Sequence, residues 1–328
     1  MKKLFVTVLA LLLLIPSVSG CSDIQRDDEI SVVCTVFPIY DWTKNIIGEA
    51  DGVELSLLVS NGTDLHSYQP TAADIIAVTD CDLLICLGGT SDAWIEEALA
   101  QNPSDTRRVI RLDEVQGVTL RHISQDSLAS ECEGDGCHDG HDHAHSETDE
   151  HLWLSLKNAQ AAVRAISEEL SALNEENSEL YLANAEAYTE KLGALDGKYA
   201  ELAESATSPY VLFADRFPFV YLMDDHGIGY TAAFSVCTTD TDASPDTIIR
   251  LASAANEKKL EYLIVTESSD RSLANSVIRA TDSKDQDILV MDSMQSVTEG
   301  DIKSGTSYLS VMESNLSVLC TALGIEKS

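Results

Sequence analysis

The segment SVVCTVFPIYDWTKNIIGEADGVELSLLV, residues 31–59, decides the fold of the first half of the chain. Two β-rich apolar runs, 31–37 and 53–59, flank a helical pattern over 40–48. The helical pattern ends at Gly48, and glycine is a usual residue at a helix end. Strands that alternate with helices predict a parallel sheet with helices on both faces.

The same alternation continues on both sides of a long helical pattern. In the first half it predicts strands at 81–89 and 107–112 and helices at 71–80 and 92–100. In the second half it predicts strands at 210–214, 230–234, 262–267 and 287–292, and helices at 244–260, 272–281 and 307–323. Apolar residues at spacings of three and four, without a proline, make residues 156–205 helical. We therefore predict an α/β fold of two lobes, each with a mainly parallel sheet flanked by helices, joined by a long rigid backbone helix.

The predicted lobes set the domain boundaries. The N-terminal lobe covers 31–173, the linking helix 174–206 and the C-terminal lobe 207–328. A polar, glycine-containing, histidine-rich loop, 126–149, interrupts the first lobe.

The N-terminus has the pattern of an export signal. Two lysines precede an apolar run, 4–16, which is too short to span a bilayer, and small residues then precede Cys21. This pattern is typical of a bacterial lipoprotein signal peptide, 1–20, followed by a lipidated Cys21 and a flexible linker, 21–30. Ordinary secretion with a free Cys21 is the alternative. We expect an extracytoplasmic protein that is lipid-anchored to the bacterial cell membrane.

The charge of the chain limits its partners. With 21 Lys and Arg against 55 Asp and Glu, the formal net charge is −34. This argues against a nucleic-acid partner and against a polybasic membrane patch. A negative surface raises the local concentration of cations, although it also serves solubility alone.

The seven cysteines other than Cys21 do not define a disulfide pattern. Those in apolar runs are expected to be buried as small hydrophobic residues: Cys34, Cys81 and Cys86. The connectivity of the remaining four stays open: Cys132, Cys137, Cys237 and Cys320.

Three residues that can bind a metal follow predicted strands or precede the long helices. His66 lies in the loop after the strand 53–59, His151 precedes the helical region beside Trp153, and Asp292 ends the strand 287–292. In open parallel sheets, ligands bind beyond the carboxyl ends of the strands. These three residues therefore predict a metal site between the lobes, gripped by both.

At these residues the sequence resembles the metal-binding solute-binding lipoproteins of ABC importers for zinc and manganese, the helical-backbone metal receptors. The matching segments run in family order over nearly all of the mature chain: NGTDLHSYQPTAADI (61–75), GGTSDAWIEEAL (88–99), DEHLWLSLKNAQ (149–160), NSELYLANAEAYTEKL (177–192) and SYLSVMESNLSVL (307–319). The resemblance implies two lobes on one rigid helix, a single metal ion between them, and delivery of that ion to a membrane permease. By position, His66 and His151 match the family's first two histidines, and Asp292 matches the carboxylate after the last strand.

The family's remaining ligand, a His or Glu after the first strand of the second lobe, has no counterpart here. The loop expected there covers 213–230, and at the matching place it reads Ala214, Asp215 and Arg216. Asp215 is the nearest potential ligand, whereas Arg216 stays protonated and could pair with a ligating carboxylate instead. Cys237 or a water molecule are alternatives, and His226 lies too far along the chain and is expected to pack locally.

The ligand types favour zinc over manganese. Two imidazoles with carboxylates suit tetrahedral zinc, whereas manganese prefers more oxygen ligands. In zinc-uptake members of the family, a histidine-rich loop precedes the second histidine. Here that loop supplies an accessory set expected to bind metal weakly and exchangeably: His138, His141, His143 and His145. A solvated spacer is the alternative for this loop.

Two rival functions make different predictions. A zinc hydrolase needs an open metal position and a general base, and the sequence contains no HExxH motif. We therefore expect no enzymatic activity. A surface adhesin is the other alternative, because relatives in the family have been described as adhesins. The sequence as a whole favours a monomeric receptor that captures zinc, or alternatively manganese, and delivers it to an ABC permease.

Overall fold

The computed structural model describes residues 29–123, 147–234 and 243–325. The predicted signal peptide, Cys21 and almost all of the linker lie outside these ranges. So do three of the cysteines and the accessory histidines: Cys132, Cys137, Cys237, His138, His141, His143 and His145. Among the described residues, no helix combines the length and the apolar composition needed to cross a bilayer.

The N-terminal lobe is built on a four-stranded sheet in which every neighbouring pair is parallel. Its order is β2 (Val53–Leu57), β1 (Ile30–Cys34), β3 (Leu83–Cys86), β4 (Arg108–Arg111). Successive side chains point to opposite faces. Val32 and Cys34 therefore pack with α1 (Phe37–Ile47) and α4 (Leu156–Leu173). Val33, between them, packs on the other face with α2 (Ala72–Asp80) and α3 (Ala93–Gln101).

The C-terminal lobe repeats this plan. Its parallel sheet has the order β10 (Asp287–Met291), β9 (Tyr262–Thr266), β7 (Tyr210–Arg216), β8 (Gly229–Phe234). One face packs against α7 (Pro245–Lys258) and α8 (Ser272–Ala280). The other faces α6 (Val220–His226), α10 (Tyr308–Ala322) and the long helix α5 (Ser178–Ser205). The predicted fold class and all eight predicted strands are confirmed.

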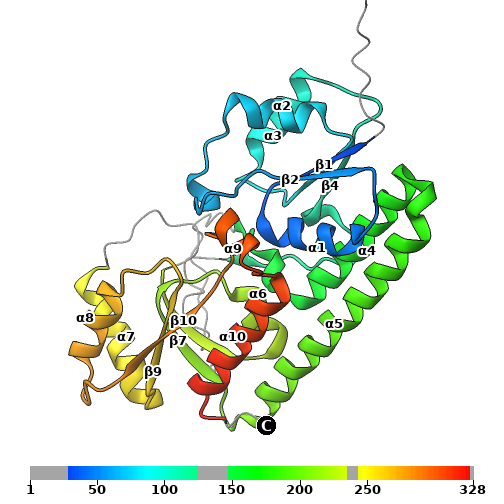
Figure 1. The fold of residues 1–328 in the computed structure, drawn as a ribbon. Helices are drawn as coiled ribbons and strands as arrows, with labels where there is room; N and C mark the ends of the chain where they lie inside the picture. The colour runs from blue at the N-terminus through cyan, green and yellow to red at the C-terminus, as the bar shows by residue number, and fades with distance from the viewer. Residues whose placement is uncertain (1–28, 124–146, 235–242, 326–328) are drawn as a thin grey trace, which may run out of the picture.

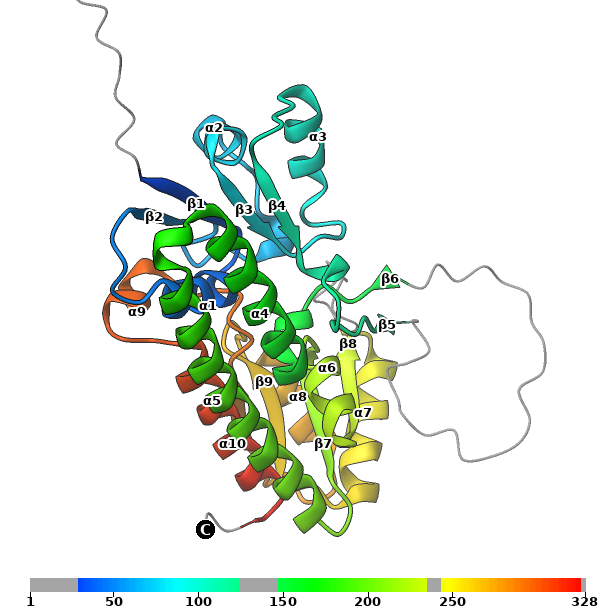
Figure 2. The ribbon, with the colours of Figure 1, turned by 90° about the vertical axis from the view of Figure 1, so that its right-hand side faces the viewer.

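The helix α5 contacts both lobes. Figures 1 and 2 show it running along one side of the molecule, and its 28 residues span about 40 Å. On its buried stripe, the Tyr188 hydroxyl donates to Asp41 of α1 (3.2 Å), and the Tyr199 hydroxyl donates to the Met312 carbonyl of α10 (2.6 Å). A turn capped by the Asn174 side chain separates α5 from α4. The domain boundaries at 173 and 206 stay a prediction.

Two local predictions are corrected. The first strand ends at Cys34, not at residue 37, because α1 already begins at Phe37 with Pro38 in its first turn, where the fixed φ of proline suits a helix. The segment 213–230, expected as a loop, contains the end of β7 and the helix α6, which stops at Gly227 in the left-handed conformation.

Smaller elements complete the chain. They are η1 (Leu65–Ser67), η2 (Leu112–Glu114), η4 (Leu152–Leu154), η5 (Glu175–Asn177), the pair β5 (His122–Ile123) and β6 (Glu147–Thr148), and α9 (Glu299–Lys303). The predicted burial of Cys34, Cys81 and Cys86 is confirmed. Burial raises the pKa of the Cys34 thiol to about 12, so these cysteines fill space rather than react.

Candidate metal centre

The two predicted histidines meet between the lobes. His66 lies on η1, in the loop after β2, and His151 immediately precedes η4. Their Nε2 atoms lie 3.4 Å apart. Two ligands of a tetrahedral zinc ion, each at about 2.05 Å, would lie about 3.3 Å apart. The pair therefore has the separation that a shared tetrahedral metal ion requires.

His151 is fixed by its neighbour Asp149. One oxygen of this buried carboxylate accepts the His151 Nδ1–H (2.9 Å) and also the His151 backbone N–H (2.7 Å). The proton on Nδ1 leaves the Nε2 lone pair facing His66. Burial lowers the pKa of His151, but contacts with Asp149, Gln295 and Glu150 together raise it above its ordinary value.

His66 is held by weaker contacts. The Ser91 hydroxyl lies 3.2 Å from His66 Nδ1, and a Glu150 oxygen lies 3.7 Å from the same nitrogen. Glu150 in turn accepts the Ser91 backbone N–H at 2.8 Å. Burial and the proximity of His151 lower the pKa of His66, so its imidazole is neutral and available as a ligand at neutral pH.

Gly89 makes room for the carboxylate of Glu150. Gly89 has a φ of +83°, and a Cβ at this position would lie 2.6 Å from the Glu150 side chain. Only glycine combines this conformation with such a close approach.

The carboxylates predicted as ligands accept hydrogen bonds within the second lobe. Asp292 follows β10, and its Oδ1 accepts the Met294 N–H at 2.7 Å. Burial and the nearby charge of Glu267 raise the pKa of Asp292 to about 6. Asp215 uses both oxygens within its lobe, accepting from Arg216 N and from the amide and hydroxyl of Thr266. The structure thus brings His66 and His151 together, while these contacts of Asp292 and Asp215 lie within the second lobe, so both stay predicted ligands.

A cavity of about 90 Å³ adjoins the histidine pair. Its lining includes His66 and Asp64 from the first lobe, and Arg216, Glu267, Ser293 and Gln295 from the second. Within the described ranges, no group of three or more His, Cys, Asp or Glu side chains is arranged to hold a metal ion. A further ligand from the part of the chain that the structure describes is therefore of another type or moves into place.

Glu267 and Gln295 are site residues that sequence reasoning missed. Glu267 accepts from the Ser293 N–H (2.9 Å), from the Ser293 hydroxyl (2.8 Å) and from the Ser296 hydroxyl (3.2 Å), so it anchors the loop after β10. The Gln295 amide nitrogen donates to the Ser293 hydroxyl at 3.2 Å, the side chain contributes to the raised pKa of His151, and its buried Oε1 has no hydrogen-bond partner. This leaves an amide oxygen beside the imidazole pair. The only sequence signal for Gln295 is its position three residues beyond Asp292.

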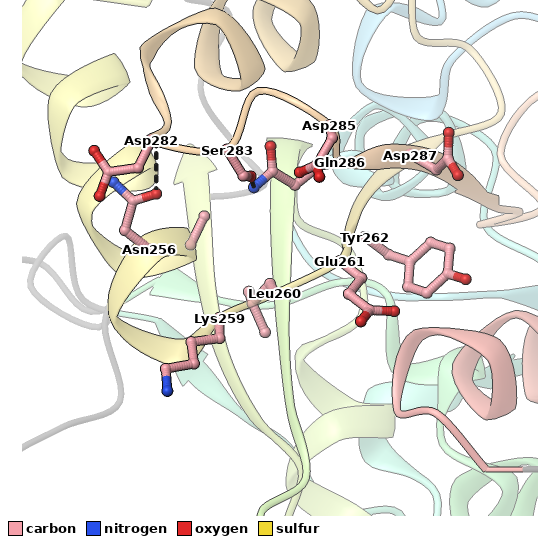
Figure 3. Close-up of a pocket in the computed structure, with 11 residues that line it drawn as sticks. Asn256, Lys259, Leu260, Glu261, Tyr262, Asp282, Ser283, Asp285, Gln286 and Asp287 are labelled. Atoms are coloured by element: carbon pink, nitrogen blue, oxygen red, sulfur yellow. Dashed lines mark hydrogen bonds between the residues drawn. The ribbon is translucent and has the colours of Figure 1, made fainter.

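Two other features lie away from this centre. His226 packs locally as expected, stacked on Tyr199 and 3.4 Å from an Asp196 oxygen. A cavity of about 430 Å³ in the second lobe is lined by acidic side chains at the amino ends of β9 and β10 (Figure 3). Its position is opposite to the carboxyl ends where ligands of such sheets bind. Within it Gln286 is satisfied by Thr281 and Ser283.

Two α/β lobes on a long helix, with paired imidazoles between them, define a two-lobed metal-binding solute receptor. The family model of the zinc-uptake complex component A, periplasmic (ZnuA), matches residues 32–322. The chain belongs to this family, whose members are metal-binding receptors and not enzymes. The predicted family is therefore confirmed.

Named relatives agree with this assignment. The chain is 32% identical over 299 residues to the zinc-binding lipoprotein AdcA of Streptococcus pneumoniae, covering 90% of this chain but only 56% of AdcA. It is 24% identical over 307 residues to the high-affinity zinc uptake system protein ZnuA of Bacillus subtilis, covering 94% of this chain and 91% of that protein. The chain thus spans little more than half the length of AdcA.

A solved structure shares the fold. The crystal structure of the Zn(II)-bound ZnuA-like domain of S. pneumoniae AdcA superimposes with a TM-score of 0.70 at 27% identity. The match covers 90% of this chain and 99% of that domain.

Proposed function

We propose that this chain is an extracytoplasmic, lipid-anchored receptor that captures one zinc ion between its lobes and delivers it to the permease of an ABC importer. The observation that carries the proposal is the 3.4 Å separation of His66 Nε2 and His151 Nε2. The relatives support the choice of metal, because AdcA and the B. subtilis protein are named for zinc binding and zinc uptake.

The remaining ligands are also part of the proposal. Gln295 Oε1 is one candidate, because this buried oxygen has no hydrogen-bond partner, and water fits the small cavity that Gln295 lines. Asp292 accepts from Met294 through Oδ1, which leaves Oδ2 for zinc, whereas Asp215 uses both oxygens in contacts with Arg216 and Thr266. Two imidazoles with oxygen donors suit zinc better than manganese.

Zinc affinity measured by competition with a chelator tests the proposal. The wild type binds one tightly held zinc ion, and His66→Ala weakens this binding by at least about 100-fold because an inner ligand is lost. His122→Ala is the matched control, since His122 is exposed and contacts Thr148 instead of the pair. Unchanged tight binding in His66→Ala, or tighter binding of manganese than of zinc by the wild type, contradicts the proposal.

Delivery and anchoring are tested in cells. A deletion strain is expected to grow poorly in zinc-depleted medium and to recover with added zinc. Normal growth with lost surface attachment would support an adhesin instead. Cys21→Ser is expected to release the protein from the membrane fraction, because the lipid anchor is lost.

A further inference from the structure

An ion pair between two residues that line the cavity joins the two lobes. Arg216 Nη1 lies 3.0 Å from Asp64 Oδ2, although the two residues are 152 positions apart. Asp64 belongs to the loop after β2 of the first lobe, and Arg216 is the last residue of β7 in the second. Both side chains are partly exposed, and both line the cavity.

Asp64 contacts both Arg216 and the backbone of His66, a proposed ligand. Its Oδ2 takes the guanidinium, while its Oδ1 accepts the backbone N–H of His66 at 2.9 Å as the cap of η1. A capping carboxylate fixes the start of a helical turn. Arg216 is therefore connected to the turn that carries His66 by one side chain, that of Asp64.

The local backbone of β7 directs Arg216 to this place. The pairing with β8 shifts register between Phe213 and Arg216, and such an irregularity re-aims the side chains at the end of a strand. Asp215 directly precedes Arg216, and its carboxylate accepts both the backbone N–H and the hydroxyl of Thr266. It also accepts the Arg216 N–H, so the root of the arginine side chain is held.

We propose that Arg216 and Asp64 form a latch between the lobes that holds the His66 turn in its metal-binding position before the ion arrives. This inference rests on the proposed function, and Arg216 acts in it as a positioning residue that does not touch the metal. An ordered ligand binds more tightly because less freedom is lost on binding. The pair carries no net charge, so it holds His66 without adding positive charge beside the ion.

A simple field effect makes a different prediction from the latch. Without positioning, Arg216→Gln removes a positive charge and strengthens cation binding, whereas Asp64→Asn removes a negative charge and weakens it. With positioning, both substitutions break the same contact and both weaken binding. Asparagine keeps an oxygen that can cap η1, so Asp64→Asn removes the ion pair more selectively than alanine would.

The test compares zinc affinity in Arg216→Gln, Asp64→Asn and the double variant. Each single substitution is expected to raise the zinc dissociation constant about three- to fivefold, a size typical of a partly exposed ion pair. The zinc dissociation constant of the double variant is expected not to exceed that of the single variant that binds zinc less tightly, because both substitutions break the same contact. Opposite signs, additive losses or no change in either single variant overturn the latch.

Hydrogen exchange in the zinc-free protein gives a second readout. The amides of His66, Ser67 and Tyr68 are expected to exchange several-fold faster in Arg216→Gln. Arg111→Gln is the matched control: it breaks an ion pair with Glu96 (2.6 Å) elsewhere on the first lobe and should change neither readout. Unchanged exchange in Arg216→Gln overturns the latch. A wild type that binds no zinc refutes the proposed function alone, and the exchange data still decide the latch.

Discussion

His151 and His66 face one another, but the chain holds them in different ways. The His151 side chain is fully buried, bonded to Asp149, and followed by the buried turn Leu152–Leu154. The His66 side chain is 23% exposed and lies on a three-residue turn in which Leu65 is buried, while His66 and Ser67 make polar contacts. One half of the centre thus belongs to the core, whereas the other is set on the surface by hydrogen bonds and an ion pair.

This difference indicates which side of the centre contributes to folding stability and which contributes to metal affinity alone. Buried, densely packed segments open only with the whole fold, while short polar turns move at low cost. Changes around His151 should therefore alter both stability and metal binding. Changes around His66 should alter metal binding alone, which makes that side the place where affinity can be adjusted.

The largest expected difference is in the stability of two alanine variants without metal. His151→Ala is expected to lower the free energy of unfolding by about 2–4 kcal/mol, because it leaves a cavity and strips the buried Asp149 of its partner. His66→Ala is expected to stay within about 0.5 kcal/mol of the wild type. Urea unfolding with a chelator present measures both, and equal losses would break the comparison.

A smaller effect is expected from the partner of His151. Asp149→Asn keeps the size of the side chain but weakens its control of the imidazole proton, so the zinc dissociation constant should rise about 10- to 100-fold. The Tyr221 hydroxyl donates to the Asp149 backbone carbonyl, and that contact survives. Chelator competition measures the change. An affinity equal to that of the wild type would show that burial alone orients His151.

The His66 side also predicts a pH dependence of stability. Asp92, beside Ser91, accepts the N–H groups of Leu87 (2.7 Å) and Gly88 (3.1 Å), but burial raises its pKa to about 7. Between pH 4 and 7 the folded chain therefore binds more protons at Asp92 than the unfolded chain, so this group makes stability fall as pH rises.

Substitution of Asp92 isolates this contribution. In the chelator-treated wild type, Asp92 should lower the free energy of unfolding by on the order of 2 kcal/mol between pH 5 and 8. Asp92→Asn should remove this decline, as measured by urea unfolding. Asp105→Asn, an exposed carboxylate of the same lobe, should leave the pH profile of the wild type in place. A profile as steep in Asp92→Asn as in the wild type would assign the decline to other carboxylates.

The sequence predicted the fold better than the site, for a physical reason. Strand and helix patterns are local and repeat along the chain, so residues 31–59 already indicated a parallel α/β lobe. His66 and His151 were found because their type is rare in the chain and each lies beside a predicted element. The segment 213–230 was misjudged because α6 is only seven residues long, too short for a helical period to show.

The rest of the centre depends on pairings far apart in the sequence. Glu267 and Gln295 reach the cavity through loops after β9 and β10, and neither has a local pattern that distinguishes it from a surface residue. The contact of Arg216 with Asp64 depends on how the lobes meet, which no periodicity encodes. The orientation of Asp292 is set by its bond to Met294 and by the pairing of its backbone with Asn315.

The smallest expected effect concerns the hydroxyl beside His66. Ser91→Ala removes the contact to His66 Nδ1, but Glu150 lies 3.7 Å from the same nitrogen and can accept its proton instead. The zinc dissociation constant should therefore rise only about two- to fourfold, with stability unchanged within about 0.5 kcal/mol. Ser104→Ala, at an exposed position of the same lobe, serves as the control for chelator competition. If Ser91→Ala weakens binding as much as Asp149→Asn does, His66 is organised as rigidly as His151, and the division between a core half and a surface half of the centre is wrong.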